Sequence, residues 1–270
     1  MAAWKLAYQA NCWGPLGGNA VGVTSTNQLT YRTFADMSVA FREISQAGYQ
    51  GVEIFDGNLL DYDVREFKNL LLDNQLSLVA AYSGGNFIYK DILDEELDRV
   101  RKVADRAAEL GAPHLVVGGG AQRFSGIQDG DYSRLADALN QIDTIAKSRG
   151  LQGHYHPHLT TIVETPEQVK KIFGQTSIHF CPDTAHLAAA GGDPALLIRE
   201  HAERISYVHL KGWQKEPFAF TPLDRGSLDT KPIIDALKSV QYQGWITVEL
   251  DAWEDPLQGA IASKKYLENV

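Results

Sequence analysis

The sequence of 270 residues has little of several features, and each shortage excludes a class of protein. Two cysteines are too few for a disulfide framework, so the composition fits the reducing cytoplasm. Acidic residues outnumber basic ones by 34 to 25, and the net charge of −9 argues against nucleic acid or an anionic membrane as the main partner. No run approaches the ~18 apolar residues of a membrane-spanning helix, and no sustained apolar run of a signal peptide follows Lys5.

Two further absences concern the organisation of the chain. No linker rich in Pro, Gly or Ser divides it, which favours a single domain over residues 1–270. None of the glycine-rich segments forms a G-x-G-x-x-G fingerprint or a Walker phosphate loop, so nucleotide binding has little support. What is present, a composition that is 44% hydrophobic and 10% aromatic, is enough to bury a core.

Short β-branched or aromatic runs alternate with longer helical patterns along the whole chain. The expected strands are 6–11, 51–55, 77–83, 114–118, 151–156, 177–183, 205–211 and 245–251. Helices are expected over 33–47, 94–110 and 131–149, and again from Thr165, Thr230 and Asp255 onward. Eight strand–helix units in ~250 residues favour a closed barrel over an open sheet. The expected fold is therefore α/β, a single (β/α)8 TIM barrel.

Polar side chains gather near the ends of these strands, on the face that a barrel turns inward. Alternation along each strand places on that face Glu53, His154, His156, Asp183, His209, Lys211 and Glu249. Active sites of such barrels lie at the C-terminal ends of the strands, and inward charges need a partner, a metal or water. A divalent metal is the simplest compensation, and imidazole with carboxylates fits Mn, Fe, Co or Zn better than Ca.

Each of these residues also has a plain structural explanation. A single His at a strand end is more often a hydrogen-bonded structural residue, Glu249 could pair with Lys211, and Asp183 could cap the helix that follows. Four strands that each supply a candidate ligand at the same depth are harder to explain in that way. The joint pattern favours the metal site.

Three segments carry a family resemblance, namely CPDTAH at 181–186, YVHLKGW at 207–213 and WITVELD at 245–251. Together with the loop LDRGSLD at 223–229, they resemble the xylose isomerase-like TIM barrels, the group of sugar isomerases, epimerases and inosose dehydratases. The resemblance covers the chain from about residue 51 to the C-terminus. It implies a metal held by Glu, Asp, His and Glu from strands five to eight, and it matches Asp183, His209 and Glu249 to the last three.

The fifth expected strand departs from the family pattern E-x-H-P, because it reads His154-Tyr155-His156-Pro157. His154 stands where the usual Glu ligand would be. Either His154 replaces that Glu as a ligand, or only three protein ligands remain. The segment YHPHLTTIVET at 155–165 is most similar to the inosose dehydratases of the family, which also lack this Glu. The departure argues against a plain aldose–ketose isomerase or epimerase, in which two opposed carboxylates often move the proton.

The implied chemistry is the abstraction of a proton beside a carbonyl that a bound cation polarises. His156 is expected as the base or acid, with Glu53 as its partner across the barrel. Lys211 is expected to donate a proton or to contact a substrate oxygen, and an ion pair with Glu249 or Asp251 is its alternative. The remaining expected substrate contacts are Trp13, Tyr82, His158, His186, Trp213 and Arg225.

The sequence therefore predicts a cytoplasmic lyase that depends on a divalent metal, with Mn as the first choice and Co, Fe, Zn and Mg as alternatives. The enzyme would eliminate water or another β-leaving group from a keto-cyclitol or keto-sugar through an enediolate. A sugar isomerase or epimerase of the same fold and a non-catalytic sugar-binding protein are the alternative functions. The expected partner is a small molecule; neither nucleic acid nor a membrane is expected, and a homo-oligomer is left open.

Overall fold

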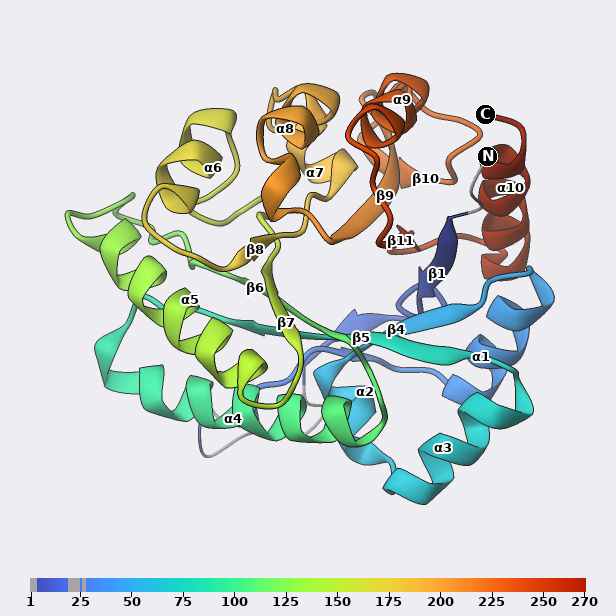
Figure 1. Ribbon diagram of the computed structural model, residues 1–270, viewed down its shortest axis with the longest axis horizontal. Coiled ribbons are helices and arrows are strands. Elements are labelled where there is room, and N and C mark those ends of the chain that lie inside the picture. The colour runs from blue at the N-terminus through green and yellow to red at the C-terminus, as the bar shows by residue number, and fades with distance from the viewer. Residues whose placement is uncertain (1–3, 19–24, 26–27) are drawn as a thin grey trace.

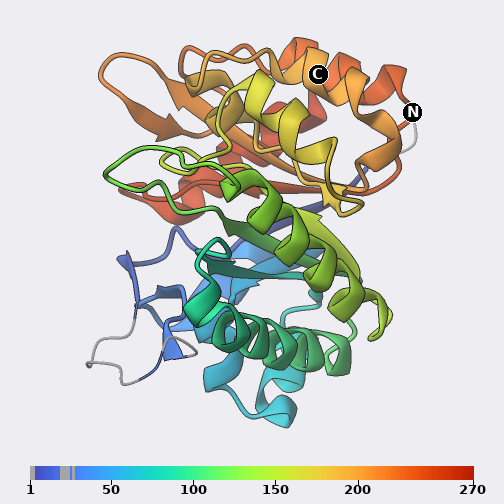
Figure 2. The ribbon, with the colours of Figure 1, turned by 90° about the vertical axis from the view of Figure 1, so that its left-hand side faces the viewer.

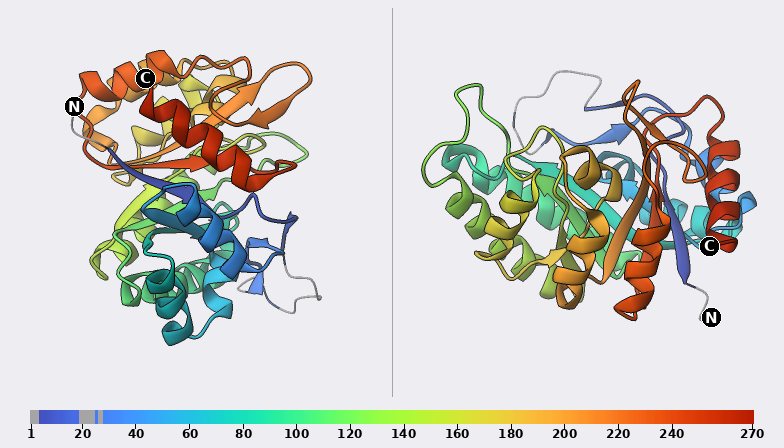
Figure 3. Two further views of the ribbon diagram at one scale, coloured as in Figure 1. Left: turned by 90° about the vertical axis from the view of Figure 1, so that its right-hand side faces the viewer. Right: turned by 90° about the horizontal axis from the view of Figure 1, so that it is seen from above.

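The structure is a computed structural model that describes residues 4–18, 25 and 28–270. Strands form one curled sheet, and helices lie along its outer side (Figure 1). The loop after residue 119 and the hairpin near residue 217 project on the same side of the molecule, at the C-terminal ends of the strands (Figures 2 and 3). No helix in the described part of the chain is long and apolar enough to cross a membrane.

The main sheet contains all eight strands that the sequence predicts. Its members are β1 (Lys5–Gln9), β4 (Gly51–Phe55), β5 (Ser77–Gly85), β6 (His114–Gly119), β7 (Gln152–Tyr155), β8 (His179–Phe180), β9 (Tyr207–Gln214), β10 (Ala219–Thr221) and β11 (Trp245–Glu249). They lie in the order β10-β9-β11-β1-β4-β5-β6-β7-β8, and all pairs are parallel except the β9–β10 hairpin. Two short strands, β2 (Leu16–Gly17) and β3 (Arg32–Thr33), form a separate antiparallel pair.

The helices follow the strands, as a β/α alternation requires. They are α1 (Met37–Gln46), α2 (Asp56–Asp61), α3 (Val64–Asp73), α4 (Lys90–Glu109), α5 (Asp131–Lys147), α6 (Pro166–Phe173), α7 (Thr184–Ala189), α8 (Pro194–Glu200), α9 (Lys231–Ser239) and α10 (Pro256–Glu268). Helix α1 begins later than the predicted residue 33, because the Asp36 side chain caps it by accepting from the Ser38 N–H at 2.8 Å. Helix α6 begins as predicted, behind a capping box of Thr165 and Gln168.

The sequence predicts a closed barrel, but the sheet is not closed between β8 and β9. Strand β8 is shorter than predicted and does not pair with β9 as a strand; a single parallel bridge, Asp183–His209, joins the two segments. The His209 N–H donates to the Pro182 carbonyl at 3.0 Å, but Pro182 has no N–H with which to extend a ladder. In place of further backbone bonds, the Thr184 hydroxyl donates to the Lys211 carbonyl and accepts from the Lys211 N–H, both at 2.9 Å. The sheet is thus curled, with an open seam between β8 and β9.

Two apolar clusters pack on the two faces of this sheet. The larger one lies between the sheet and the helices, and it includes Val208 and Leu210 of β9 and Val248 of β11, all buried. The smaller one fills the inside of the sheet with Ala7, Val79, Ala80, Val116, Cys181 and Tyr207. The predicted alternation in β9 and β11 is therefore confirmed. Inside the sheet, the rings of His114 and His154 pack against Tyr207 of this smaller cluster.

Candidate metal centre and substrate pocket

Four buried side chains converge at the C-terminal ends of four parallel strands. His156 follows β7, Asp183 follows β8, His209 lies in β9 and Glu249 ends β11. Each offers one ligand atom, and these atoms all lie within 4.8 Å of one another. Asp183 bridges His209, and Glu249 lies at the end of β11, which pairs in parallel with β9. We call these four residues the ion group.

The chemistry of the ion group fits a divalent cation. Among the described residues, both ring nitrogens of His156 and the Oδ2 of Asp183 are buried without a hydrogen-bond partner. His156 Nε2 and Asp183 Oδ2 lie 3.6 Å apart, beyond hydrogen-bonding distance. An unsatisfied buried polar group costs ~1–3 kcal/mol, and a bound cation would satisfy these lone pairs. Two imidazoles and two carboxylates are donors that transition-metal dications accept.

Glu53 of β4 holds His209 in place. Its carboxylate accepts from Gln9 Nε2 at 2.8 Å, from the Tyr207 hydroxyl at 2.6 Å and from His209 Nε2 at 2.9 Å. With Nε2 directed at Glu53, the other ring nitrogen, Nδ1, lies 2.6 Å from Glu249 Oε2 within the ion group. A carboxylate behind a histidine ligand orients the ring and raises its basicity. Glu53, which the sequence predicts as the partner of His156, thus contacts His209, and among the described residues it makes no hydrogen bond or ion pair with His156.

The charges around His209 favour its protonated form while no cation is bound. Burial lowers its pKa, but Cys181, Glu53 and Glu249 outweigh burial and raise the pKa well above the usual value. A histidine ligand must give up this proton to bind a cation, so ion binding would release it. Ion affinity should therefore depend on how firmly Glu53 fixes the Nε2 proton.

Replacing Glu53 with Gln is expected to weaken ion binding by about 10–100-fold, the range measured when such carboxylate partners are changed. The amide keeps the shape of the side chain but removes the charge that orients His209. The measurement is a titration of the metal-free protein with Mn²⁺ or Zn²⁺ in competition with a chelator. Glu43→Gln is the matched control, since the Glu43 carboxylate accepts from Trp13 Nε1 at 2.6 Å, outside the ion group. Equal affinity in both variants would contradict the role of Glu53.

His154 lies one step deeper along β7 than His156, and the ion group does not include it. Its Nε2 lies 3.0 Å from His114 Nδ1, and its ring packs against His179 and Tyr207. Burial lowers the pKa of both His154 and His114, to about 4 for His114, so both rings are neutral at pH 7. The geometry therefore favours His156 over His154 as the metal ligand from this strand. His156 lies two residues after His154, which occupies the ligand position of the family pattern.

Replacing His154 with Ala is expected to leave ion affinity unchanged while it lowers the free energy of unfolding by ~2–4 kcal/mol. The reason is that His154 fills the interior and pairs with His114, whereas the donors of the ion group stay in place. Urea unfolding and metal titration of the same preparation measure the two effects. His201→Ala, at a half-buried ring outside the site, serves for comparison. Loss of the ion from the His154 variant would restore His154 as a ligand.

Lys211 is fully buried and holds two carboxylates. Its Nζ lies 3.0 Å from Glu249 Oε1 and 2.7 Å from Asp251 Oδ1. Burial lowers the pKa of Lys211, but Asp251 and Glu249 outweigh it, so the pKa lies above its usual value and the ammonium stays charged. The ion pair that the sequence left as the alternative is present. Lys211 thereby fixes the direction of Glu249 within the ion group.

His158 and His186 form a second pair of rings beside the ion group. Their centroids lie 3.7 Å apart, and each centroid lies 5.8 Å from that of His156. His158 Nδ1 lies 2.6 Å from the Leu159 carbonyl, so we assign the ring proton to Nδ1 and a free lone pair to Nε2. Burial and the neighbouring His156 lower the pKa of His158 to about 4. At pH 7 this ring is neutral and can accept a proton.

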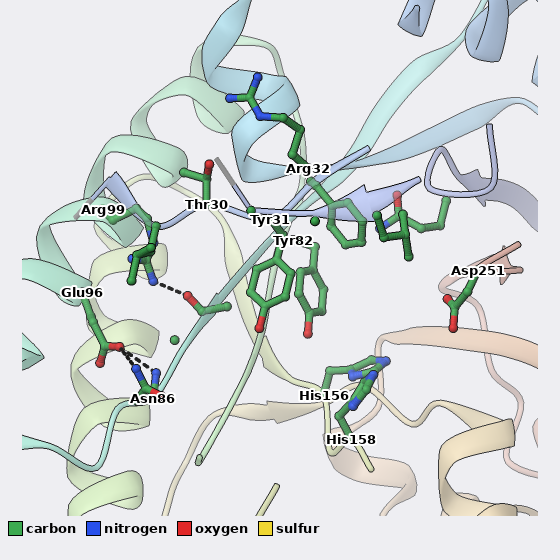
Figure 4. Close-up of a pocket in the computed structure, with 18 of the residues that line it drawn as sticks. Thr30, Tyr31, Arg32, Tyr82, Asn86, Glu96, Arg99, His156, His158 and Asp251 are labelled. Carbon is green, nitrogen blue, oxygen red and sulfur yellow. Dashed lines mark hydrogen bonds between the residues drawn. The ribbon is translucent and has the colours of Figure 1, made fainter. Parts of the chain in front are cut away.

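A cavity of about 590 Å³ opens beside the ion group (Figure 4). His156, His158, Glu249 and Asp251 line one end of it. Tyr82 of β5 lines its wall, with the ring centroid 5.7 Å from that of His156. The cavity thus joins the candidate cation site to two of the expected substrate contacts, His158 and Tyr82.

The other expected substrate contacts lie elsewhere. The described residues that line the cavity do not include Trp13, Trp213, Arg225 or His186. Trp13 is held by Glu43, and Arg225 lies exposed with its Nε donating to Asp224 Oδ1 at 2.9 Å. His186 adjoins the ion group through its backbone N–H, which donates to Asp183, and through its ring, which packs against His158. Trp13 and Arg225 lie in loops and His186 lies in α7, so strand alternation does not determine where these side chains point. Trp213 lies near the end of β9.

Charged residues line the opposite end of the cavity, and the sequence analysis did not select them. Glu96 and Arg99 of α4 are each only 2% exposed, and both line this end together with Asn86. In the sequence they stand next to Leu97 and Val100, which α4 packs against the core. A charged pair at the edge of an apolar helix face was the available signal.

Comparison with known proteins adds a family and several relatives. A family model described as "Xylose isomerase-like TIM barrel" matches residues 41–270. The inosose dehydratase of Clostridium beijerinckii is 26% identical over an alignment of 264 positions, which covers 85% of this chain and 88% of that protein. The inosose dehydratase of Lacticaseibacillus casei is 26% identical over an alignment of 288 positions, which covers 94% of this chain and 96% of that protein.

Solved structures share the fold at lower identity. A D-allulose 3-epimerase from Methylomonas sp., in complex with D-allulose, is 17% identical with a TM-score of 0.78, over 98% of this chain and 96% of that one. The 3-keto-D-glucoside 4-epimerase from E. coli is 18% identical with a TM-score of 0.75, over 99% and 100%. A probable 3-DHS dehydratase from Bacillus anthracis is 14% identical with a TM-score of 0.74, over 88% and 95%. At these identities the likeness is one of fold alone.

Proposed function

The chain belongs to the xylose isomerase-like TIM barrel family, and from this premise we propose that it is a metal-dependent lyase that eliminates water from a keto-cyclitol or keto-sugar. The observation that carries the proposal is a buried ion group at one end of a cavity that His158 also lines. The names of the relatives support elimination, since inosose dehydratases match most of the chain. We also propose that residues 1–270 fold as one domain, because β1 pairs with β11 and with β4 in one sheet.

His156, Asp183, His209 and Glu249 would hold the cation, for which Mn²⁺ is our first candidate. When bound, the cation supplies positive charge that polarises the substrate carbonyl and stabilises the negative charge developing beside it. The protein contributes the positions of its donors: Glu53 fixes His209, and Lys211 fixes Glu249.

We assign the proton transfer to His158. Its Nε2 bears the free lone pair, and the ring lines the cavity that the substrate would enter. His158 would take the proton from the carbon beside the carbonyl, and the electrons of that C–H bond would form the new double bond as the neighbouring C–O bond breaks. The protonated ring would then return its proton to the departing hydroxyl, which leaves as water. His158 thus takes over the role expected of His156, which offers one of its ring nitrogens to the ion group.

A sugar epimerase of the same fold is the second candidate, because two of the solved neighbours carry that name. The contacts of two carboxylates favour elimination. Glu53 already accepts three hydrogen bonds, and Asp251 pairs with Lys211, so neither is free to shuttle a proton. A proton shuttle between two opposed carboxylates therefore has little support at this site.

The test of the proposed function is incubation of the Mn²⁺-loaded protein with 2-keto-myo-inositol. Elimination creates a double bond conjugated with a carbonyl, so we expect a new ultraviolet absorbance to grow with time. A chelator should stop this reaction, and added Mn²⁺ should restore it. An isomeric ketone as the only product would favour the epimerase, and no product would overturn the choice of this substrate.

A further inference from the structure

The cavity extends well beyond the ion group. Its volume of about 590 Å³ lies within the ~300–1,000 Å³ typical of pockets for drug-sized ligands, which is more than a single six-membered ring fills. One end carries His156 and Glu249, and the other carries Asn86, Glu96 and Arg99 (Figure 4). A substrate ring held at the ion group would therefore leave the second end to another group.

An aromatic wall connects the two ends. The ring centroids of Tyr31, Phe55 and Tyr82 lie 5.6–5.9 Å from one another, and all three residues line the cavity. Tyr31 is 48% exposed, so its ring is available to a ligand. A Cβ at Gly84 would lie 2.0 Å from Tyr31 Cε2, so only glycine at this position lets the ring lie against β5. Such a surface suits the C–H-rich face of a sugar ring.

The far end is built from buried polar groups that neighbouring residues hold in place. Glu96 accepts from the Asn86 N–H at 2.7 Å, from Asn86 Nδ2 at 3.0 Å and from the Phe87 N–H at 2.8 Å. Arg99 donates through Nη2 to the Gly84 carbonyl, and its Nε lies 3.8 Å from Asp56 Oδ2. The amide, carboxylate and guanidinium thus line the cavity in fixed directions, as recognition of a specific polar group requires.

The charge of the far end indicates what kind of group it accepts. The Arg99 guanidinium lies beside the Asp56 carboxylate, and the Glu96 carboxylate lines the same end of the cavity. Arg32, which also lines the cavity, is paired with Asp61, so these groups together carry a formal sum of one negative charge. A phosphate or carboxylate would be repelled, whereas neutral hydroxyls can donate to Glu96 and accept from Arg99 or Asn86. The far end therefore fits an uncharged, polyhydroxylated group.

We propose that this far end is a second subsite, which binds a neutral sugar ring attached to the ring held at the ion group, with Tyr31 stacking on it. The inference rests on the proposed function only for the identity of the first ring. It extends the substrate class from a single keto ring to a keto ring that carries a second, uncharged sugar. Tyr31 and Arg99 would then determine specificity without taking part in the elimination.

Calorimetric titration of the Mn²⁺-loaded protein with three unreactive ligands tests the proposal. They are myo-inositol, galactinol, which is the same cyclitol carrying a galactose, and myo-inositol 1-phosphate, in which the extension is charged. We expect galactinol to bind at least about tenfold more tightly than myo-inositol, and the phosphate to bind no more tightly. Tyr31→Ala should bring the affinity for galactinol down to that for myo-inositol. Phe124→Ala, which removes an exposed ring that does not line the cavity, should change neither affinity.

The outcomes separate this subsite from the reaction. Equal affinities for galactinol and myo-inositol, no binding of galactinol, or an equal loss for both ligands in Tyr31→Ala would each overturn the subsite. Tighter binding of the phosphate would overturn its neutral character. If 2-keto-myo-inositol is not converted but galactinol retains its Tyr31-dependent advantage, the subsite stands and the proposed reaction falls. The variant is expected to fold, because Tyr31 contacts Asp56 and Gly57 through its backbone.

Discussion

Replacing Asp183 with Asn should lower kcat/KM by ~10³-fold and weaken ion binding, because it removes one of the two anionic donors of the ion group. Oδ2 of Asp183 is the buried oxygen without a hydrogen bond, and Oδ1 accepts from the His186 N–H at 2.8 Å as the N-cap of α7. Asparagine is an equally good N-cap, so α7 should keep its start. The expected loss of kcat/KM and of ion affinity therefore comes from removing the charge and the donor oxygen, and not from disrupting α7.

The measurement compares the metal content and the rate of elimination in the variant and the parent protein. Asp193→Asn is the matched control, since Asp193 caps α8 by accepting from the Ala195 and Leu196 N–H groups, and the ion group does not include it. This control should retain both metal content and rate. If Asp183→Asn also retained both, the cation would have to bind elsewhere, and our assignment of the ion group would be wrong.

Replacing His158 with Gln should lower kcat by ~10²–10⁴-fold while the metal content stays at the level of the parent protein. The physical reason is that Gln has no basic nitrogen to take the substrate proton, whereas His158 presents Nε2 to the cavity and lies outside the ion group. Metal analysis and steady-state kinetics on one preparation separate the two roles. His201→Gln, at a half-buried ring remote from the cavity lining, is the control.

Two results would contradict this assignment. A parallel loss of metal and rate would make His158 a ligand of the cation. An unchanged rate would move the base to another group, for which the neighbouring His186 is the next candidate because its Nδ1 is buried without a partner among the described residues.

The sequence predicts the strands and their faces well because both depend on local patterns. Alternation placed Tyr207, His209 and Lys211 inward and Val208 and Leu210 outward, and the two apolar clusters confirm this division. Alternation gives the face but not the depth, because it repeats every two residues. His154, His156 and His158 therefore look alike in sequence, and only the three-dimensional structure shows that one pairs with His114, one joins the ion group and one lines the cavity.

Features that depend on distant contacts could not be predicted. In its motif Lys211 could be a proton donor or an ion-pair partner, and the choice depends on Glu249 and Asp251, which approach from β11 and the loop after it. Arg225 belongs to a family-like loop, yet the course of that loop leaves it exposed beside Asp224. Glu96 and Arg99 reach the cavity from a helix, and no strand pattern could reveal them.

The open seam of the sheet gives the cation a structural role, because the cation would join the two sides of the seam. Between β8 and β9, the backbone contributes a single bridge, and its two residues, Asp183 and His209, are also two of the four donors. A cation that binds both would close the seam from the side-chain end, where Pro182 prevents the backbone from doing so. By linkage, whatever stabilises the closed seam also raises the affinity for the cation. Opening of the sheet at this seam and dissociation of the cation are then coupled. Amide protons along the seam should exchange with solvent more slowly when the cation is bound.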